Sequence, residues 1–182
     1  MSNEPAITID AIEPSKSPVG TAKILRPDFR FMRGKASRWI AFGFGAGLAP
    51  IAPGTVGTLW AWAAFLWIDP WLGDAAWALV LVLGTAVGVI ACRRTGEALG
   101  IQDHGAIVWD EIIAFWLVLW VLNGSFGQQL TAFLVFRMFD IVKPPPIRWV
   151  DRTVGGGWGV MADDLLAACL TLLVLAIGRA LG

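Results

Sequence analysis

Long apolar runs alternate with short polar blocks along most of this chain. Residues 39–68 carry no charge, but Pro50 and Pro53 interrupt that run. Because helical hydrogen bonding does not pass cleanly through such a pair of prolines, the pattern predicts two helices joined by a loop. The first helix, the loop and the second helix are expected at residues 37–48, 49–54 and 55–68.

Further apolar segments follow in the rest of the chain. Residues 75–92 approach the roughly 20 residues that a bilayer core requires, and a pair of arginines ends this run. The prolines that follow Lys143 end a later run, because proline cannot continue a helix. Helices are therefore expected at residues 75–92, 107–122, 128–142 and 160–181, with polar loops at 95–106 and 143–158. The pattern predicts an all-α fold, a polytopic membrane bundle of about four to five apolar helices, several of them short.

The first 36 residues differ from the rest of the chain. They are rich in Pro, Ser, Lys and Arg and show no apolar period, which predicts a disordered tail. The basic end of this tail is expected to act as a solvated linker or to contact anionic lipid headgroups. Residues 37–182 are expected to form one membrane-embedded helical domain.

Composition supports a membrane location. The chain is 57% hydrophobic and 15% charged, with a mean hydropathy of +0.66 and 11 tryptophans, outside the usual range of soluble domains. Its formal net charge is zero, so no overall field favours binding to nucleic acid. Cys92 and Cys169 lie in apolar runs, which favours two buried thiols over a disulfide framework.

The distribution of basic residues predicts an orientation. Lys and Arg occur in the N-terminal tail and in residues 93–106 and 143–158, whereas the loops at 69–74 and 123–129 carry none. Because positive loops stay on the cytoplasmic side, the basic segments are expected to face inward and the C-terminus outward. This prediction brings four polar blocks, residues 52–57, 103–111, 136–148 and 159–164, to the cytoplasmic face. Whether the helix at 37–48 crosses the bilayer is left open.

Five carboxylates of these blocks stand close to the ends of apolar helices. A carboxylate beside hydrocarbon is costly unless it is paired, metal-bound or wetted. Oxygen donors suit Mg²⁺, whereas a single histidine and the absence of a cysteine cluster argue against zinc. For the pair near the start of the last helix, compensation of the helix dipole is an alternative. The candidate metal ligands are Asp110, Glu111, Asp140, Asp163 and Asp164.

Basic and polar side chains in the same blocks are candidate phosphate ligands. Arg137 and Asp140 share a helical face, and they form either a structural ion pair or a site in which Arg137 or Lys143 holds phosphate oxygens. The Pro-Gly-Thr-Val-Gly turn leads into a helix with Thr55 as its expected N-cap, where free N–H groups favour an anion. The candidate substrate-binding residues are Thr55, Arg137, Lys143 and Arg148, and His104 is a candidate proton-transfer group.

Other phosphatase and transport chemistries fit less well. The sequence contains no Cys-x₅-Arg loop and no Gly-x₄-Gly-Lys-Ser/Thr loop. An ion-coupled membrane transporter is an alternative because intramembrane acids often mark ion routes, but such proteins commonly have two matching halves and this chain shows no internal repeat. A headgroup transferase that uses the same metal site is a further alternative.

With these residues described, the chain resembles the phosphatidylglycerophosphatase A family of bacterial inner-membrane enzymes. The resemblance covers residues 38–181 and depends on four motifs in combination. They are Gly-Leu-Ala-Pro-Ile-Ala-Pro-Gly-Thr-Val-Gly-Thr-Leu, Asp-His-Gly-Ala-Ile-Val-Trp-Asp-Glu, Phe-Arg-Met-Phe-Asp-Ile-Val-Lys-Pro-Pro-Pro-Ile-Arg-Trp and Gly-Gly-Trp-Gly-Val-Met-Ala-Asp-Asp. Members usually carry glycine where Ala114 stands here, a change that removes no chemical group.

The resemblance implies Mg²⁺-dependent hydrolysis of phosphatidylglycerophosphate to phosphatidylglycerol and phosphate, in phospholipid biosynthesis at the cytoplasmic face of the inner membrane. The partner is then a phospholipid in the bilayer, and the oligomeric state is left open. The nucleophile is either a metal-activated water or a carboxylate that forms an acyl-phosphate. The expected catalytic residues are Asp110, Glu111, Asp140, Asp164 and His104.

Overall fold

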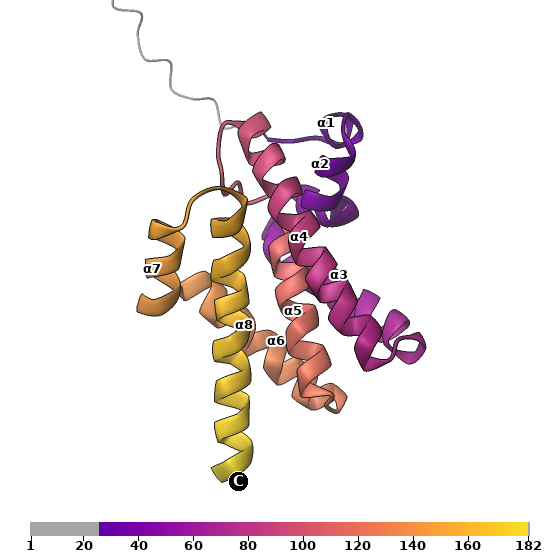
Figure 1. Ribbon diagram of the computed structural model, residues 1–182, viewed down its shortest axis with the longest axis vertical. Coiled ribbons are helices and arrows are strands. Elements are labelled where there is room, and N and C mark those ends of the chain that lie inside the picture. Colours follow the sequence, from indigo (N-terminus) through magenta and orange to yellow (C-terminus); the bar gives the residue numbers. More distant parts are fainter. Residues whose placement is uncertain (1–25, 182) are drawn as a thin grey trace, which may run out of the picture.

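The computed structural model describes residues 26–181, and this part of the chain is helical without any strand. The all-α prediction is confirmed. Figure 1 shows two long helices, α4 and α8, with shorter helices around them. The helices are α1 (Phe29–Arg33), α2 (Ala36–Ala41), a 3₁₀ segment (Gly43–Leu48), α3 (Pro53–Ile68), a 3₁₀ turn (Asp69–Trp71), α4 (Asp74–Leu99), α5 (Trp109–Leu122), α6 (Phe126–Val142), α7 (Pro145–Thr153) and α8 (Gly156–Leu181).

Helix α5 forms the centre of the bundle and packs against α3, α4, α6 and α8. Most of its side chains are buried, including Ile112, Phe115 and Leu119, none of which is exposed to solvent. Indole N–H groups join it to its neighbours, since a buried tryptophan needs an acceptor. Trp116 Nε1 donates to the Ala61 carbonyl of α3 at 2.8 Å, which fixes α3 against α5.

Among the described residues, two helices are long and apolar enough to cross a membrane, α4 and α8. Each has 26 residues, about 39 Å at 1.5 Å per residue, which exceeds a hydrocarbon core of about 30 Å. Only 28% and 39% of their most apolar windows are buried inside the protein, so most of that apolar surface faces outward. This exposure is typical of helices in contact with lipid. The larger number of four to five spanning helices stays a prediction.

The predicted helix at 37–48 is wrong in its second half. Helix α2 ends at Ala41, and residues 43–48 form a 3₁₀ segment with Phe44 and Gly45 at φ of 56° and 112°. A side chain at Gly43 would collide with Ile112 of α5, so the backbone turns here because it passes close to the core. Helix α3 then begins at Pro53, with Ala52 and not Thr55 at its N-cap.

Two predicted loops contain helical turns. Helix α7 occupies part of the expected loop at 143–158, because prolines are tolerated in the first turn of a helix. Helix α4 continues past Arg93 and Arg94 as far as Leu99, and Gly100 ends it in the left-handed conformation. Helix α8 begins at Gly156, one turn earlier than expected. The polar ends of the bundle are therefore more regular than the sequence pattern indicates.

The N-terminal segment also folds further toward the start of the chain than expected. Residues 1–25 of the predicted tail lie outside the described residues, but residues 29–33 form α1. The Asp28 carboxylate caps this helix by accepting the Phe31 N–H at 2.7 Å, and Met32 is buried beneath it. The expectation of two buried thiols holds for Cys92 and is wrong for Cys169, which is exposed.

Candidate active site

The four polar blocks meet at one end of the bundle. Glu111 in the first turn of α5, Asp140 in the last turn of α6 and Asp164 in α8 offer carboxylate oxygens within 4.8 Å of one another. These residues, here called the carboxylate triad, are 29 and 24 positions apart along the chain. The triad unites three of the five acids that the sequence singles out.

Arg137 provides the positive charge at the triad. Its Nη1 lies 2.9 Å from Glu111 Oε1 and 2.6 Å from Asp140 Oδ2, and these three side chains are each about one-eighth exposed. Ion pairs at this depth are only weakly screened by solvent. The predicted pairing of Arg137 with Asp140 is confirmed, and the additional partner Glu111 comes from a different helix.

Thr58 on α3 holds Arg137 from the other side. This buried hydroxyl donates to the Gly54 carbonyl at 2.9 Å and accepts from Arg137 Nη1 at 3.3 Å. The sequence analysis missed Thr58, although it follows Gly54 by one helical turn and is, with Thr55, one of two hydroxyl residues on an otherwise apolar helix. A hydroxyl among apolar side chains was the available sign that Thr58 has a polar partner.

Glycines allow the start of α3 to approach Glu111 closely. A Cβ atom at Gly54 would overlap the Glu111 carboxylate, and one at Gly57 would lie 3.3 Å from Glu111 Oε2. The positive end of the α3 dipole therefore lies against an acid of the triad. Thr55 is half-buried in the same turn. Its predicted role in anion binding stays a prediction.

Lys143 organises a second group of acids beside the triad. Its Nζ lies 2.5 Å from Asp163 Oδ2, 3.0 Å from Asp151 Oδ1 and 3.9 Å from Asp103 Oδ2. Asp163, a predicted metal ligand, therefore belongs to a lysine-centred group and not to the triad. The sequence analysis did not assign Asp103 or Asp151 a role. Asp151 could not be placed because the helix that brings it back toward α8, α7, was not expected.

Electrostatics in this second group favour a charged lysine. Burial lowers the pKa of Lys143, but the hydrogen bonds and charges of Asp163 and Asp151 outweigh it, so the pKa lies above its ordinary value. Burial raises the pKa of Asp103, and the positive charge of Lys143 partly offsets that rise. The lysine-centred group thus places one positive charge among three carboxylates at the junction of α6, α7 and α8.

The remaining predicted residues lie around these two groups. Asp110 is buried, its Oδ1 accepts the Glu111 N–H at 3.0 Å, and it belongs to neither group, so its metal contact stays a prediction. His104 Nδ1 accepts the Ala106 N–H at 3.1 Å and borders a hollow of about 340 Å³ next to Pro53. Arg148 is exposed on α7, where it donates to the Val142 carbonyl, outside both groups.

The donor set of the triad fits a hard divalent cation. Glu111 Oε2 and Asp164 Oδ2 are buried, and neither has a hydrogen-bond partner among the described residues. A buried carboxylate oxygen without a partner carries a desolvation cost that a bound cation would offset. Carboxylate oxygens are also the ligands that Mg²⁺ prefers. The triad is therefore the candidate metal site.

Comparison with known proteins assigns the chain to a family. The sequence model of the phosphatidylglycerophosphatase A family matches residues 39–179, which include the triad, Arg137 and Thr58. The chain belongs to this family. The resemblance expected from the four motifs is therefore confirmed.

Two relatives bear the family's name. Phosphatidylglycerophosphatase A of Escherichia coli K12 is 44% identical over 137 residues, 75% of this chain and 79% of the relative. The Haemophilus influenzae enzyme of that name is 39% identical, over 75% of this chain and 84% of its own length.

A third relative carries another name. A protein of Bacteroides thetaiotaomicron, named a putative phosphatidylinositol-3-phosphatase, is 35% identical over 77% of this chain and 91% of its own length. No solved structure matches the chain significantly.

Family membership settles the broad chemistry. This member of the phosphatidylglycerophosphatase A family is a phosphoric monoester hydrolase that acts on a phospholipid. The sequence-based alternative of an ion-coupled transporter finds no support among these relatives. Residues 26–38, which include α1, lie outside the match.

Proposed function

We propose that this protein removes the terminal phosphate of phosphatidylglycerophosphate in a Mg²⁺-dependent reaction, giving phosphatidylglycerol and inorganic phosphate. The reaction would serve phospholipid biosynthesis at the cytoplasmic face of a bacterial inner membrane. One observation carries the proposal: two acids of the carboxylate triad bind Arg137, and the triad presents buried oxygens that lack a partner among the described residues.

The triad would hold the metal ion, with Glu111, Asp140 and Asp164 as its protein ligands. Bound there, Mg²⁺ would polarise a phosphoryl oxygen and offset negative charge that develops in the transition state. Asp110 and Asp163 remain additional candidate ligands from neighbouring positions in α5 and α8. Magnesium usually keeps several water ligands, so a site of this size needs few carboxylates.

Arg137 and the start of α3 would bind the substrate phosphate. The Arg137 guanidinium has a planar array of donors suited to phosphate oxygens, and two acids with Thr58 hold it in place. Free N–H groups in the first turn of α3 add donors on the same side. These groups would orient the phosphate while the diacylglycerol part stays in the bilayer.

The proposed cytoplasmic orientation depends on charge. The exposed arginines Arg93 and Arg94 lie near the end of α4 from which the chain leads into the site, whereas the turn that joins α3 to α4 carries only acidic charge. Retention of positive charge on the inner side would place the site at the cytoplasmic headgroups. A phospholipid phosphate at that level would meet the triad without leaving the membrane.

The proposed activity can be tested with purified protein in detergent micelles. Phosphate release from phosphatidylglycerophosphate should require Mg²⁺, and Asp140→Asn should lower kcat by about 10²-fold or more. Asp74→Asn is the matched control, because its carboxylate lies at the far end of α4 and its Trp120 contact needs only an acceptor oxygen. Phosphatidylinositol 3-phosphate should be included as a competing substrate. Wild-type turnover by Asp140→Asn, or faster release from the inositol lipid, would contradict the proposal.

The nucleophile can be identified in the same preparation. In a single turnover in oxygen-18 water, direct attack by water places label in the released phosphate and none in the protein. Attack by a carboxylate forms an acyl-phosphate, and label enters that side chain only when water then attacks its carbonyl carbon; attack at phosphorus again places the label in the phosphate. Hydroxylamine, which converts an acyl-phosphate into a hydroxamate, followed by mass spectrometry of peptides that contain Asp110, Asp140 and Asp164, therefore distinguishes the two routes.

A further inference from the structure

Two adjoining hollows lie on the side of the bundle formed by α4, α5 and α8. The larger is a groove of about 610 Å³ lined almost entirely by apolar side chains, among them Leu81, Ile113 and Leu165. The smaller is a polar pocket of about 390 Å³ with Arg93 and Gln102 in its wall. Val89 and Trp158 line both hollows, so the apolar groove and the polar pocket adjoin at these two residues.

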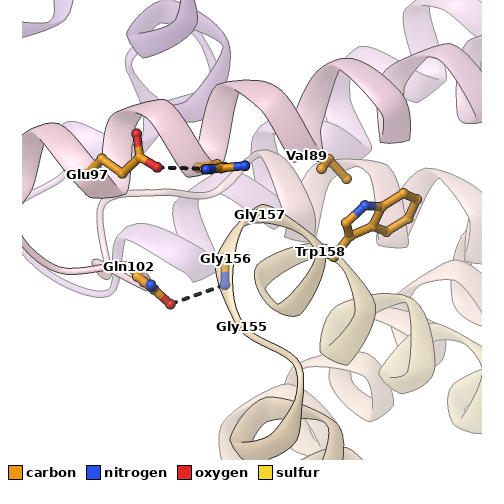
Figure 2. A pocket seen from close by; sticks show the side chains of 8 residues that line it. Val89, Glu97, Gln102, Gly155, Gly156, Gly157 and Trp158 are labelled. Carbon is orange, nitrogen blue, oxygen red and sulfur yellow. Dashed lines mark hydrogen bonds and ion pairs between the residues drawn. The ribbon is translucent and has the colours of Figure 1, made fainter.

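The polar pocket is formed by a glycine turn at the start of α8. Figure 2 shows Gln102 facing the turn of Gly155, Gly156 and Gly157, with Trp158 beside Val89. Gln102 Oε1 accepts the Gly156 N–H at 3.1 Å, and a side chain at Gly157 would overlap the Val89 carbonyl. The glycines therefore bring the turn close to α4 and add no side chains of their own to the pocket.

The pocket contains an accessible positive charge. Arg93 pairs with Glu97 at 2.9 Å, but both side chains are more than half exposed. An exposed i,i+4 pair contributes only about 0.3–0.5 kcal/mol, so Arg93 can turn to another anion at little cost. The adjacent Trp158 is 61% exposed. Exposed tryptophans are common in membrane proteins at the level of the membrane–water interface.

The groove lies on the opposite side of α5 from the triad. Glu111 faces α3 and Arg137, whereas Ile113 and Leu117 face the groove. Two positions along a helix correspond to a rotation of about 200°, so these side chains diverge. A lipid whose chain fills the groove therefore has that chain on the side of α5 away from Glu111 and Arg137. Such a lipid is then a second lipid, apart from the one whose phosphate would bind at the triad.

We propose that the groove and the polar pocket together form a binding site for a resident anionic glycerophospholipid. One acyl chain occupies the apolar groove, and the headgroup phosphate lies in the polar pocket beside Arg93. The groove volume falls within the range of about 300–1,000 Å³ that is usual for small-molecule sites. The apolar-to-polar order of the two hollows matches that of a phospholipid.

Native mass spectrometry of the purified full-length protein measures this binding without any turnover. The protein is titrated with phosphatidylglycerol and, separately, with phosphatidylcholine. We expect an adduct with phosphatidylglycerol that forms about tenfold more tightly than the phosphatidylcholine adduct, a difference of about 1.4 kcal/mol. Both headgroups carry a phosphate, but the quaternary ammonium of phosphatidylcholine brings a positive charge close to Arg93 and offsets part of the attraction. Phosphate release is measured in parallel, so that a failure of the proposed enzymatic function is recognised separately.

Two pairs of variants locate the site. Ala86→Trp fills the groove, whereas Val87→Trp adds the same side chain to an exposed position of α4 outside it. Arg93→Gln removes the charge from the pocket, whereas Arg94→Gln removes an exposed charge that does not line it. We expect Ala86→Trp and Arg93→Gln each to weaken the phosphatidylglycerol adduct about tenfold or more, with both controls unchanged.

Several results would overturn the proposal. Equal adducts in the Ala86 and Val87 variants would show that the lipid binds elsewhere. Equal binding of the two lipids, unaffected by Arg93→Gln, would show that no anionic headgroup is recognised. Loss of a dimer in Ala86→Trp would identify the groove as a contact between copies of the chain. An increase in KM for phosphatidylglycerophosphate in Ala86→Trp would identify the occupant as the substrate.

Discussion

The contact between Gly54 and Glu111 leads to a specific prediction for Gly54→Ala. An added Cβ atom would overlap the Glu111 carboxylate, which is the flexible end of its side chain. The carboxylate can therefore move away without disturbing the backbone of α3 or α5. Movement would stretch the 2.9 Å contact with Arg137 and shift Glu111 relative to Asp140 and Asp164.

The structure indicates a large effect of Gly54→Ala on activity and a small effect on stability. Alanine is favoured over glycine within a helix by about 0.5–1 kcal/mol, which offsets part of the cost of moving a side chain. A displacement of about 1 Å in a reacting group costs on the order of 10²-fold in rate, which corresponds to ~2.7 kcal/mol in the activation free energy. We therefore expect kcat to fall about 100-fold while the melting temperature changes little.

Phosphate release and thermal unfolding in the same detergent test this prediction. Gly178→Ala is the matched control, because no atom outside its own stretch of helix lies within 4 Å of the position its Cβ would occupy. That variant should keep the turnover of the wild-type protein and have the same or a slightly higher melting temperature. Near wild-type turnover in Gly54→Ala would show that the position of Glu111 does not matter for the reaction, and the proposed site would be wrong.

Three further predictions follow from the site. Thr58→Val removes the hydroxyl that accepts from Arg137 and should lower kcat/KM about tenfold, whereas Thr58→Ser should retain activity. Equal losses of activity in both variants would argue against this hydrogen bond. Lys143→Gln leaves the Asp163 carboxylate without its counter-charge and should lower the free energy of unfolding by about 1–3 kcal/mol. Thermal unfolding should show this as a lower melting temperature, and an unchanged melting temperature would refute a stabilising role of Lys143. Chelation with EDTA should abolish phosphate release and Mg²⁺ should restore it, and activity that survives chelation would exclude metal dependence.

The sequence predicted the central helices well, for a physical reason. The starts of α5 and α6 differ from the expected ranges by two residues and their last residues agree, because polar and turn-forming segments flank uniformly apolar runs. The meeting of the four polar blocks was also predictable, since charges beside apolar helices need a common polar environment.

The errors concern segments where tertiary contacts or proline geometry decide the backbone. The break after Ala41 follows from the close approach of Gly43 to Ile112, a contact between residues distant in sequence. Helix α7 was missed because prolines that end α6 also begin the next helix.

The grouping of the acids could not be obtained from the sequence. Asp163 and Asp164 are neighbours, but successive helical residues point about 100° apart, so one faces Lys143 and the other faces Glu111 and Asp140. Which of the two points to which group depends on the rotation of α8 about its axis. That rotation is set by packing against α4, α5, α6 and α7.

Binding of Mn²⁺ as a substitute for Mg²⁺, followed by electron paramagnetic resonance, tests the central claim most directly. Both ions prefer carboxylate oxygens, so Mn²⁺ should report on the same site. We predict that Asp164→Asn abolishes the signal of bound Mn²⁺, whereas Asp151→Asn in the lysine-centred group retains it. Bound Mn²⁺ that persists in Asp164→Asn and disappears in Asp151→Asn would contradict the assignment of the triad as the metal site.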